Sequence, residues 1–171
     1  MDPTELANIF ANTKVLVIDD ELYMRKVVRT LLMSLGVRTI YEAADGNAGL
    51  DLIRSMAPHV ALVDWQMPGL DGRDFVRTVR SPETFPYPDI PIIMVTGHSE
   101  RSRVIEAMDI GVHEFLLKPV SSQALSDRLA AVLVKPRKVI RRGDYYGPEP
   151  RKPRPLREPG EKPVATRIYV N

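Results

Sequence analysis

The sequence predicts an α/β fold with a doubly wound parallel sheet, because five short apolar runs alternate with five longer segments of helical periodicity. The apolar runs are rich in β-branched residues and have the length of buried strands. These runs are residues 15–18, 39–41, 60–63, 92–95 and 114–117. Strands that alternate with helices predict crossovers that cover both faces of the sheet. We therefore expect a flavodoxin-like domain of five strands and five helices between about residues 13 and 135.

Four of the five helical segments are expected to stop at a residue that disfavours helix. The five segments cover about 22–35, 47–56, 73–80, 100–110 and 121–134. Gly36 and Gly111 follow the first and fourth segments, and Pro58 and Pro136 follow the second and fifth. Ser121 is a suitable N-cap for the fifth. Residues 1–12 are expected to be a lead-in to the domain.

Composition excludes several classes of site. The chain has 171 residues, 44% of them apolar and 27% charged, which is typical of a globular protein. It has no run of about 18 apolar residues and no signal-peptide pattern at its N-terminus, so we expect a cytoplasmic protein without a membrane span. The absence of cysteine excludes disulfides, thiol nucleophiles and zinc–thiolate sites.

The two parts of the chain differ in charge. Residues 1–135 contain 14 Lys or Arg against 18 Asp or Glu, a net charge of −4. Residues 136–171 contain 10 against 4, a net charge of +6. An acidic body argues against a nucleic-acid surface on the folded domain, so no nucleic-acid partner is expected.

Charged and hydroxyl residues follow four of the five predicted strands. Asp19 and Asp20 end the first strand, Asp64 the third, Thr96 the fourth and Lys118 the fifth. In open parallel sheets, ligands bind beyond the carboxyl ends of the strands, so these side chains should meet. Three carboxylates in one place need a cation, and hard oxygen ligands without His or Cys favour Mg²⁺, with Mn²⁺ as a substitute. Asp64 is the central carboxylate and the candidate nucleophile for phosphoryl transfer.

The sequence around these residues resembles the receiver domain of two-component response regulators over about residues 13–135. The motifs are the acidic pair 19–20, the segment 64–72 (Asp-Trp-Gln-Met-Pro-Gly-Leu-Asp-Gly), Val-Thr-Gly at 95–97 and Phe-Leu-Leu-Lys-Pro at 115–119. The resemblance implies that a histidine kinase or a small acyl phosphate phosphorylates Asp64. It implies Mg²⁺ bound by Asp20, Asp64 and the backbone carbonyl of Gln66, with Asp19 acting partly through water. It also implies that Thr96 and Lys118 contact the phosphoryl group, and that the bond from Lys118 to Pro119 is cis.

Two features depart from the family pattern. Phe115 occupies the position of the aromatic switch, where many relatives have tyrosine; it could move behind Thr96 or could simply be a core residue. The segment 81–91 is longer and richer in proline than the connection needs. The histidines at 59, 98 and 113 lack ligand spacing and are expected to have ordinary structural roles, although His98 follows the fourth strand closely enough to influence phosphate lifetime.

Residues 136–171 form a basic extension with seven prolines, which forbid a continuous helix. One interpretation is a disordered or polyproline tail. The other is an arm that packs along the domain or across a dimer partner, because apolar residues recur at 139–140, 145–146 and 168–170. A homodimer could use this arm, or the face made by the fourth helix, fifth strand and fifth helix. Binding of the basic extension to nucleic acid or an anionic membrane is the remaining alternative.

We therefore expect a stand-alone response regulator, not an enzyme, that signals to an unknown downstream protein through its phosphorylated state. A first alternative is a phosphorelay intermediate or a phosphate sink without a target of its own. A second is a Mg²⁺-dependent phosphatase with an aspartate nucleophile. Such hydrolases typically need a second carboxylate two residues after the nucleophile, and here that residue is Gln66.

Overall fold

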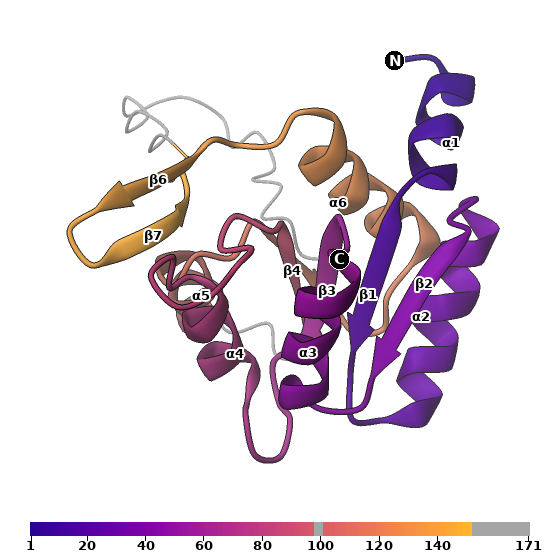
Figure 1. The fold of residues 1–171 in the computed structure, drawn as a ribbon. Coiled ribbons are helices and arrows are strands. Elements are labelled where there is room, and N and C mark those ends of the chain that lie inside the picture. Colours follow the sequence, from indigo (N-terminus) through magenta and orange to yellow (C-terminus); the bar gives the residue numbers. More distant parts are fainter. Residues whose placement is uncertain (98–100, 152–171) are drawn as a thin grey trace, which may run out of the picture.

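The computed structural model describes residues 1–97 and 101–151, and within them a five-stranded parallel sheet forms the centre of the molecule (Figure 1). The strands are β1 (Lys14–Ile18), β2 (Thr39–Ala43), β3 (Val60–Asp64), β4 (Ile92–Thr96) and β5 (Glu114–Leu117). Their order is β2-β1-β3-β4-β5, and every neighbouring pair is parallel. The predicted doubly wound, flavodoxin-like sheet is therefore confirmed.

Helices cover both faces of this sheet. They are α1 (Pro3–Ala11), α2 (Leu22–Ser34), α3 (Gly46–Met56), α4 (Gly72–Val79), α5 (Arg101–Asp109) and α6 (Ser122–Val134). Ser121 caps α6, as expected, by accepting from the backbone N–H of Ala124 at 3.1 Å. Gly36 follows α2 with φ of 97°, a conformation that favours glycine. Within the described residues, no helix is long and apolar enough to cross a membrane.

Alternation along each strand divides the core into two halves. In β1, Leu16 and Ile18 pack with residues of α3, α4 and α5, whereas Val15 and Val17 pack with residues of α1, α2 and α6. The central strand β3 is buried at all five positions, because both of its faces are covered. The sheet is thus held rigidly from both sides, which fixes the positions of its strand ends.

The expectation of five helices is corrected to six, because residues 3–11 of the expected lead-in form helix α1. The Asp2 side chain accepts from the backbone N–H of Thr4 at 3.2 Å, and Pro3 occupies the first helical position. Phe10, only 2% exposed, anchors the helix in the core half beside α2 and α6. Burial of Phe10, with Leu6 and Ile9 packed against the same core, stabilises a helix that would be too short to persist alone.

The C-terminal extension begins with an antiparallel hairpin of β6 (Val139–Arg142) and β7 (Tyr145–Pro148). Its two-residue turn contains Gly143 with φ of 58°. The hairpin lies beside the segment 81–91: the hydroxyl of Tyr146 donates to Asp89 and Arg141 pairs with Glu83. Figure 1 shows the hairpin away from the lower ends of β1 and β3, where the predicted site lies. The apolar residues 168–170 lie outside the described residues.

Candidate functional site

The site is built at the carboxyl ends of the strands. Asp19 directly follows β1, Asp64 and Thr96 are the last residues of β3 and β4, and Lys118 directly follows β5. These ends are held in register because β3 pairs with both β1 and β4, and β4 pairs with β5. The backbone N–H of Lys118 donates to the carbonyl of Thr96 at 2.8 Å and continues the pairing beyond β5. Four residues distant in sequence thus come to one edge of the sheet.

Three carboxylates meet at this edge. One oxygen each from Asp19, Asp20 and Asp64 lies within 4.8 Å of the others, close enough for all three to bind one cation. Asp19 and Asp64 are buried and Asp20 is exposed, so the cluster opens to solvent on the side of Asp20. The set contains only hard oxygen donors, which suit a divalent cation such as Mg²⁺.

Lys118 lies between the two buried carboxylates. Its Nζ is 3.2 Å from Oδ2 of Asp19 and 3.3 Å from Oδ1 of Asp64. Burial alone would lower the pKa of Lys118, but the carboxylates of Asp64 and Asp19 outweigh it, and the pKa is raised. Lys118 therefore remains charged at neutral pH and balances part of the negative charge of the cluster.

Asp64 is held in an environment that disfavours its charged form. Burial, and next the negative charge of Asp19, raise its pKa from 3.8 to about 6, although Lys118 opposes the shift and Asp20 adds to it. The ammonium group of Lys118 therefore does not offset the combined effect of burial and of the negative charge of Asp19 on the pKa of Asp64. A cation bound among the three carboxylates would oppose both effects and favour the ionised form of Asp64.

In metal-free buffer, the parent protein is expected to lose stability relative to the Asp64→Asn variant as the pH rises from about 4 to about 6. Folded Asp64 holds its proton at a higher pH than in the unfolded chain, so its ionisation costs free energy only in the folded state. Asp64→Asn removes this loss, which is at most about 3 kcal/mol at neutral pH for a shift of roughly two pKa units. Urea denaturation of both proteins with a chelator, at several pH values between about 4 and 7, measures it.

The difference in unfolding free energy between the parent and Asp64→Asn separates the contribution of Asp64 from those of other titrating groups. Burial, with the nearby Arg80 and Arg137, lowers the pKa of His113 to about 3, so that group makes both proteins more stable as the pH rises. This contribution cancels when the variant is compared with the parent. A stability difference that stayed constant over the whole pH range would contradict the raised pKa of Asp64.

The turn after Asp64 is closed by a glycine. The backbone N–H of Gly72 donates to the carbonyl of Trp65 at 2.9 Å, which folds the segment 65–72 back onto the end of β3. A Cβ at position 72 would lie 2.6 Å from the carbonyl oxygen of Asp64 and 2.9 Å from Cα of Trp65. Both contacts are with backbone, which cannot move aside. Glycine at this position therefore lets α4 begin directly against the strand that presents Asp64.

The other predicted site residues lie around the cluster. Gln66 is exposed in the loop after Asp64, and Thr96 is 5% exposed at the end of β4. Phe115 is 4% exposed and packs in the core half of α3, α4 and α5, opposite Met94 of β4. The bond between Lys118 and Pro119 is cis, as the resemblance implied.

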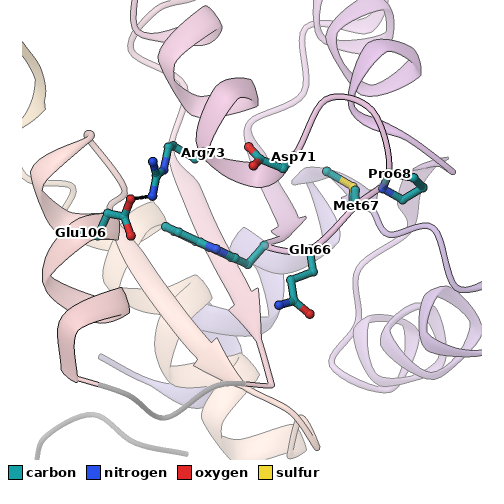
Figure 2. A pocket seen from close by; sticks show the side chains of 7 residues that line it. Gln66, Met67, Pro68, Asp71, Arg73 and Glu106 are labelled. Carbon is teal, nitrogen blue, oxygen red and sulfur yellow. Dashed lines mark ion pairs between the residues drawn. The ribbon is translucent and has the colours of Figure 1, made fainter.

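A pocket of about 560 Å³ lies along the loop that follows Asp64 (Figure 2). It is lined by Trp65, Gln66, Met67, Pro68, Asp71, Arg73 and Glu106. Figure 2 shows Arg73 of α4 reaching Glu106 of α5, and the two side chains form an ion pair. Sequence reasoning missed this pair, because nothing in a helical pattern indicates which exposed charges of two different helices will meet.

The histidines have structural contacts where the structure describes them. Nδ1 of His59 accepts from the backbone N–H of Lys14 at 2.9 Å. Nδ1 of His113 accepts from the backbone N–H of Ile92 at 3.3 Å and lies 3.1 Å from a guanidinium nitrogen of Arg80. Ordinary structural roles for these two are confirmed. His98 lies outside the described residues.

Comparison with known proteins gives one consistent result. The response regulator receiver domain family matches residues 15–130. Chemotaxis protein CheY of Pseudomonas aeruginosa is 34% identical over 119 residues, which are 70% of this chain and 94% of that protein. The structure of chemotaxis protein CheY4 of Vibrio cholerae superposes with a TM-score of 0.62 and 30% identity, covering 68% of this chain and 95% of that one. The structure of the receiver domain of the Francisella response regulator 1452 superposes with a TM-score of 0.63 and 30% identity. This match covers 69% of this chain and 93% of that one.

Proposed function

Because the chain belongs to the response regulator receiver domain family, which transmits phosphorelay signals through phosphorylation of an aspartate, we propose that Asp64 is the phosphoacceptor of this protein. The observation that carries the proposal is the cluster itself. Asp64 is a buried carboxylate with Asp19, Asp20 and the ammonium group of Lys118 around it. This combination supplies a nucleophile, the positive charge of Lys118 and a set of oxygens that would hold a cation as the second positive charge for a phosphoryl group.

Mg²⁺ is the proposed cation, with Mn²⁺ able to replace it. The carboxylates of Asp19, Asp20 and Asp64 would hold it, together with the backbone carbonyl of Gln66. The raised pKa of Asp64 and the all-oxygen donor set fit such an ion. When bound, the ion draws negative charge from the oxygens of the incoming phosphoryl group.

The reaction is an in-line displacement at phosphorus. A carboxylate oxygen of Asp64 forms a bond to phosphorus while the bond to the donor, a phosphohistidine or an acyl phosphate, breaks and its electron pair leaves with the donor. Lys118 can follow the negative charge from the carboxylate to a phosphoryl oxygen, because it is already 3.3 Å from Asp64. The hydroxyl of Thr96 can donate a hydrogen bond to another phosphoryl oxygen.

The signal would leave through the face made by α5, β5 and α6. Thr96 ends β4 and is followed by α5, and Phe115 lies in β5 beside β4. A hydrogen bond from Thr96 to the phosphoryl group would therefore change the packing of Phe115 and the position of that face. We propose a population shift between two states, read by a downstream protein, with a histidine kinase as the phosphodonor.

Beryllofluoride with Mg²⁺, which mimics the phosphoryl group, is expected to increase retention of a downstream protein from a cell extract by roughly tenfold, within the usual range of allosteric coupling. Lys118→Ala should lose most of this increase, because the mimic then lacks the cation that links β5 to Asp64. Lys26→Ala, an exposed lysine of α2, serves as the matched control and should keep it. Quantitative mass spectrometry of the retained proteins measures the ratio. Equal retention with and without the mimic would instead favour a phosphorelay intermediate or a phosphate sink.

A further inference from the structure

We propose that a groove at the end of the sheet opposite Asp64 binds the chain's own basic, proline-rich residues 152–171. The groove has a volume of about 530 Å³. It lies where the segment 86–91 leads into β4 and where Ala57 and Pro58 lead into β3, and Tyr146 of the hairpin completes it. Its lining residues are Ala57, Pro58, Pro86, Tyr87, Pro88, Asp89, Ile90, Pro91 and Tyr146.

The lining has the chemistry of surfaces that bind polyproline II segments. Such segments dock in grooves lined by aromatic rings, and here two tyrosines and four prolines form most of the wall. Tyr87 is 43% exposed and is therefore accessible to a ligand. The rings of these residues make the wall largely apolar, which suits the pyrrolidine rings of a proline-rich ligand.

The groove is rigid before any ligand binds. Proline fixes its own φ angle, so Pro86, Pro88 and Pro91 restrict the segment that forms one wall. Arg80 donates to the carbonyl of Pro88 at 2.6 Å and holds this wall to the domain. The hydroxyl of Tyr146 donates to Asp89 and orients the second ring. A preorganised groove loses little conformational entropy on binding, which favours affinity.

Residues 152–171 match this groove in composition and in charge. They contain four prolines, and five Lys or Arg against two Glu. Proline-rich sequences adopt the extended polyproline II conformation that an aromatic groove accepts. Asp89, the acidic residue of the lining, accepts from the neutral hydroxyl of Tyr146. Glu83 of the same segment pairs with Arg141 outside the lining. Asp89 thus favours a basic proline-rich ligand over an acidic one.

The hairpin places the start of residues 152–171 close to the groove. Tyr146 lies in the groove, and Arg151, only five residues later, pairs with Glu114 at the start of β5. In polyproline II, twenty residues extend to about 60 Å at roughly 3.1 Å per residue, which exceeds the distance across a domain of this size. Because the segment is covalently attached, its effective concentration is on the order of millimolar. Its own groove is therefore favoured over that of a second copy.

A spin label on the segment tests the proposal in the full-length protein. The chain has no cysteine, so Gly160→Cys gives a single labelling site. We expect paramagnetic broadening of the backbone amides of Tyr87, Asp89 and Ile90 in the groove. The amide of Asn12, in a separate groove between α1 and α6, serves as the reference and should broaden much less. Equal broadening of both regions would overturn the proposal.

Variants on both partners sharpen the test. Tyr87→Ala, or Pro153→Ala together with Pro155→Ala, should lower the ratio of docked to free segment about tenfold, as expected for the loss of one good aromatic contact. The tail variant lies beyond the hairpin and leaves the groove itself unaltered. Tyr23→Ala removes an exposed tyrosine of α2 outside the groove and should change nothing.

A mixture of labelled and unlabelled molecules identifies the occupant. Spin-labelled protein without ¹⁵N is mixed with ¹⁵N protein that has no spin label. If the segment binds within its own chain, the groove amides of the ¹⁵N protein stay sharp. If they broaden in the mixture, the groove binds the tail of a second copy, and the own-chain proposal is wrong. If no sample shows broadening, residues 152–171 do not bind the groove, and the proposal is also wrong.

Discussion

Asp64→Asn is expected to abolish phosphorylation of the protein by acetyl phosphate in the presence of Mg²⁺. Asparagine has the same shape as aspartate, but its amide oxygen carries no charge and is a poor nucleophile. Loss of a nucleophile typically lowers a rate by about 10⁴-fold or more. Incubation with acetyl phosphate followed by intact-protein mass spectrometry measures the result as the appearance of one added phosphoryl group.

The structure offers a matched control for this variant. Asp71 lies seven residues later in the same loop and caps α4 by accepting from the backbone N–H of Asp74 at 2.9 Å. Asparagine caps helices about as well as aspartate, so Asp71→Asn makes the same chemical change nearby without loss of the cap. Labelling should remain near the parent level in Asp71→Asn. If Asp64→Asn were labelled as fast as the parent, Asp64 would not be the phosphoacceptor.

Chelation separates the two parts of the same proposal. If Mg²⁺ is bound by Asp19, Asp20 and Asp64, a chelator should suppress labelling of the parent protein without altering the fold. The predicted fall in stability relative to Asp64→Asn, between about pH 4 and about pH 6, should also diminish when Mg²⁺ is added, because the ion stabilises ionised Asp64. If chelation does not affect labelling, the proposed metal is not needed for the reaction, and the assignment of Asp64 as the phosphoacceptor still stands.

The sequence is sufficient to predict where the candidate site residues meet. A buried parallel strand is a run of β-branched residues, and the residue after that run lies at the carboxyl edge of the sheet. This rule alone places Asp19, Asp64, Thr96 and Lys118 at one edge. It cannot tell that Asp19 is buried whereas its neighbour Asp20 is exposed, because that difference depends on the path of the chain after β1.

Other elements were missed for reasons that differ. The hairpin carries a local signal, a Gly-Asp pair at 143–144 between two short apolar segments, but the surrounding prolines and arginines concealed it. Helix α1 also had signals, Asp2 and Pro3, yet its stability depends on Phe10, whose burial cannot be deduced from the sequence around it. Residues whose role depends on partners far along the chain are still harder to predict from the sequence.

Arg80 is the clearest residue of this kind. It follows the last residue of α4, where an arginine would ordinarily lie on the surface, yet it is only 6% exposed. Its guanidinium donates to the carbonyls of Gly111 at 2.9 Å and Pro88 at 2.6 Å, and lies 3.1 Å from Nδ1 of His113. Burial lowers the pKa of Arg80 to about 10, so it remains charged at neutral pH. One side chain thus joins the end of α4, the proline-rich segment and the turn between α5 and β5.

Arg80→Met is expected to destabilise the fold by about 3 kcal/mol, since loss of a buried, hydrogen-bonded charge leaves its former partners without their donor. Methionine retains most of the apolar stem, so the change reports chiefly on the guanidinium. The measurement is the free energy of unfolding from urea denaturation followed by circular dichroism.

Arg77→Met, three residues earlier on the same helix, is the matched control. Arg77 is 59% exposed and lies 3.9 Å from Asp74, a surface pair that contributes at most about 1 kcal/mol. If burial and the three partners are what make Arg80 important, the two variants should differ in stability by about 2 kcal/mol or more. Because Arg80 also holds Pro88 in the wall of the groove, its variant should weaken docking of residues 152–171 as well, whereas Arg77→Met should not. Equal urea midpoints for the two variants would show that this buried guanidinium does not hold the α4 end, the proline-rich segment and the β5 turn together.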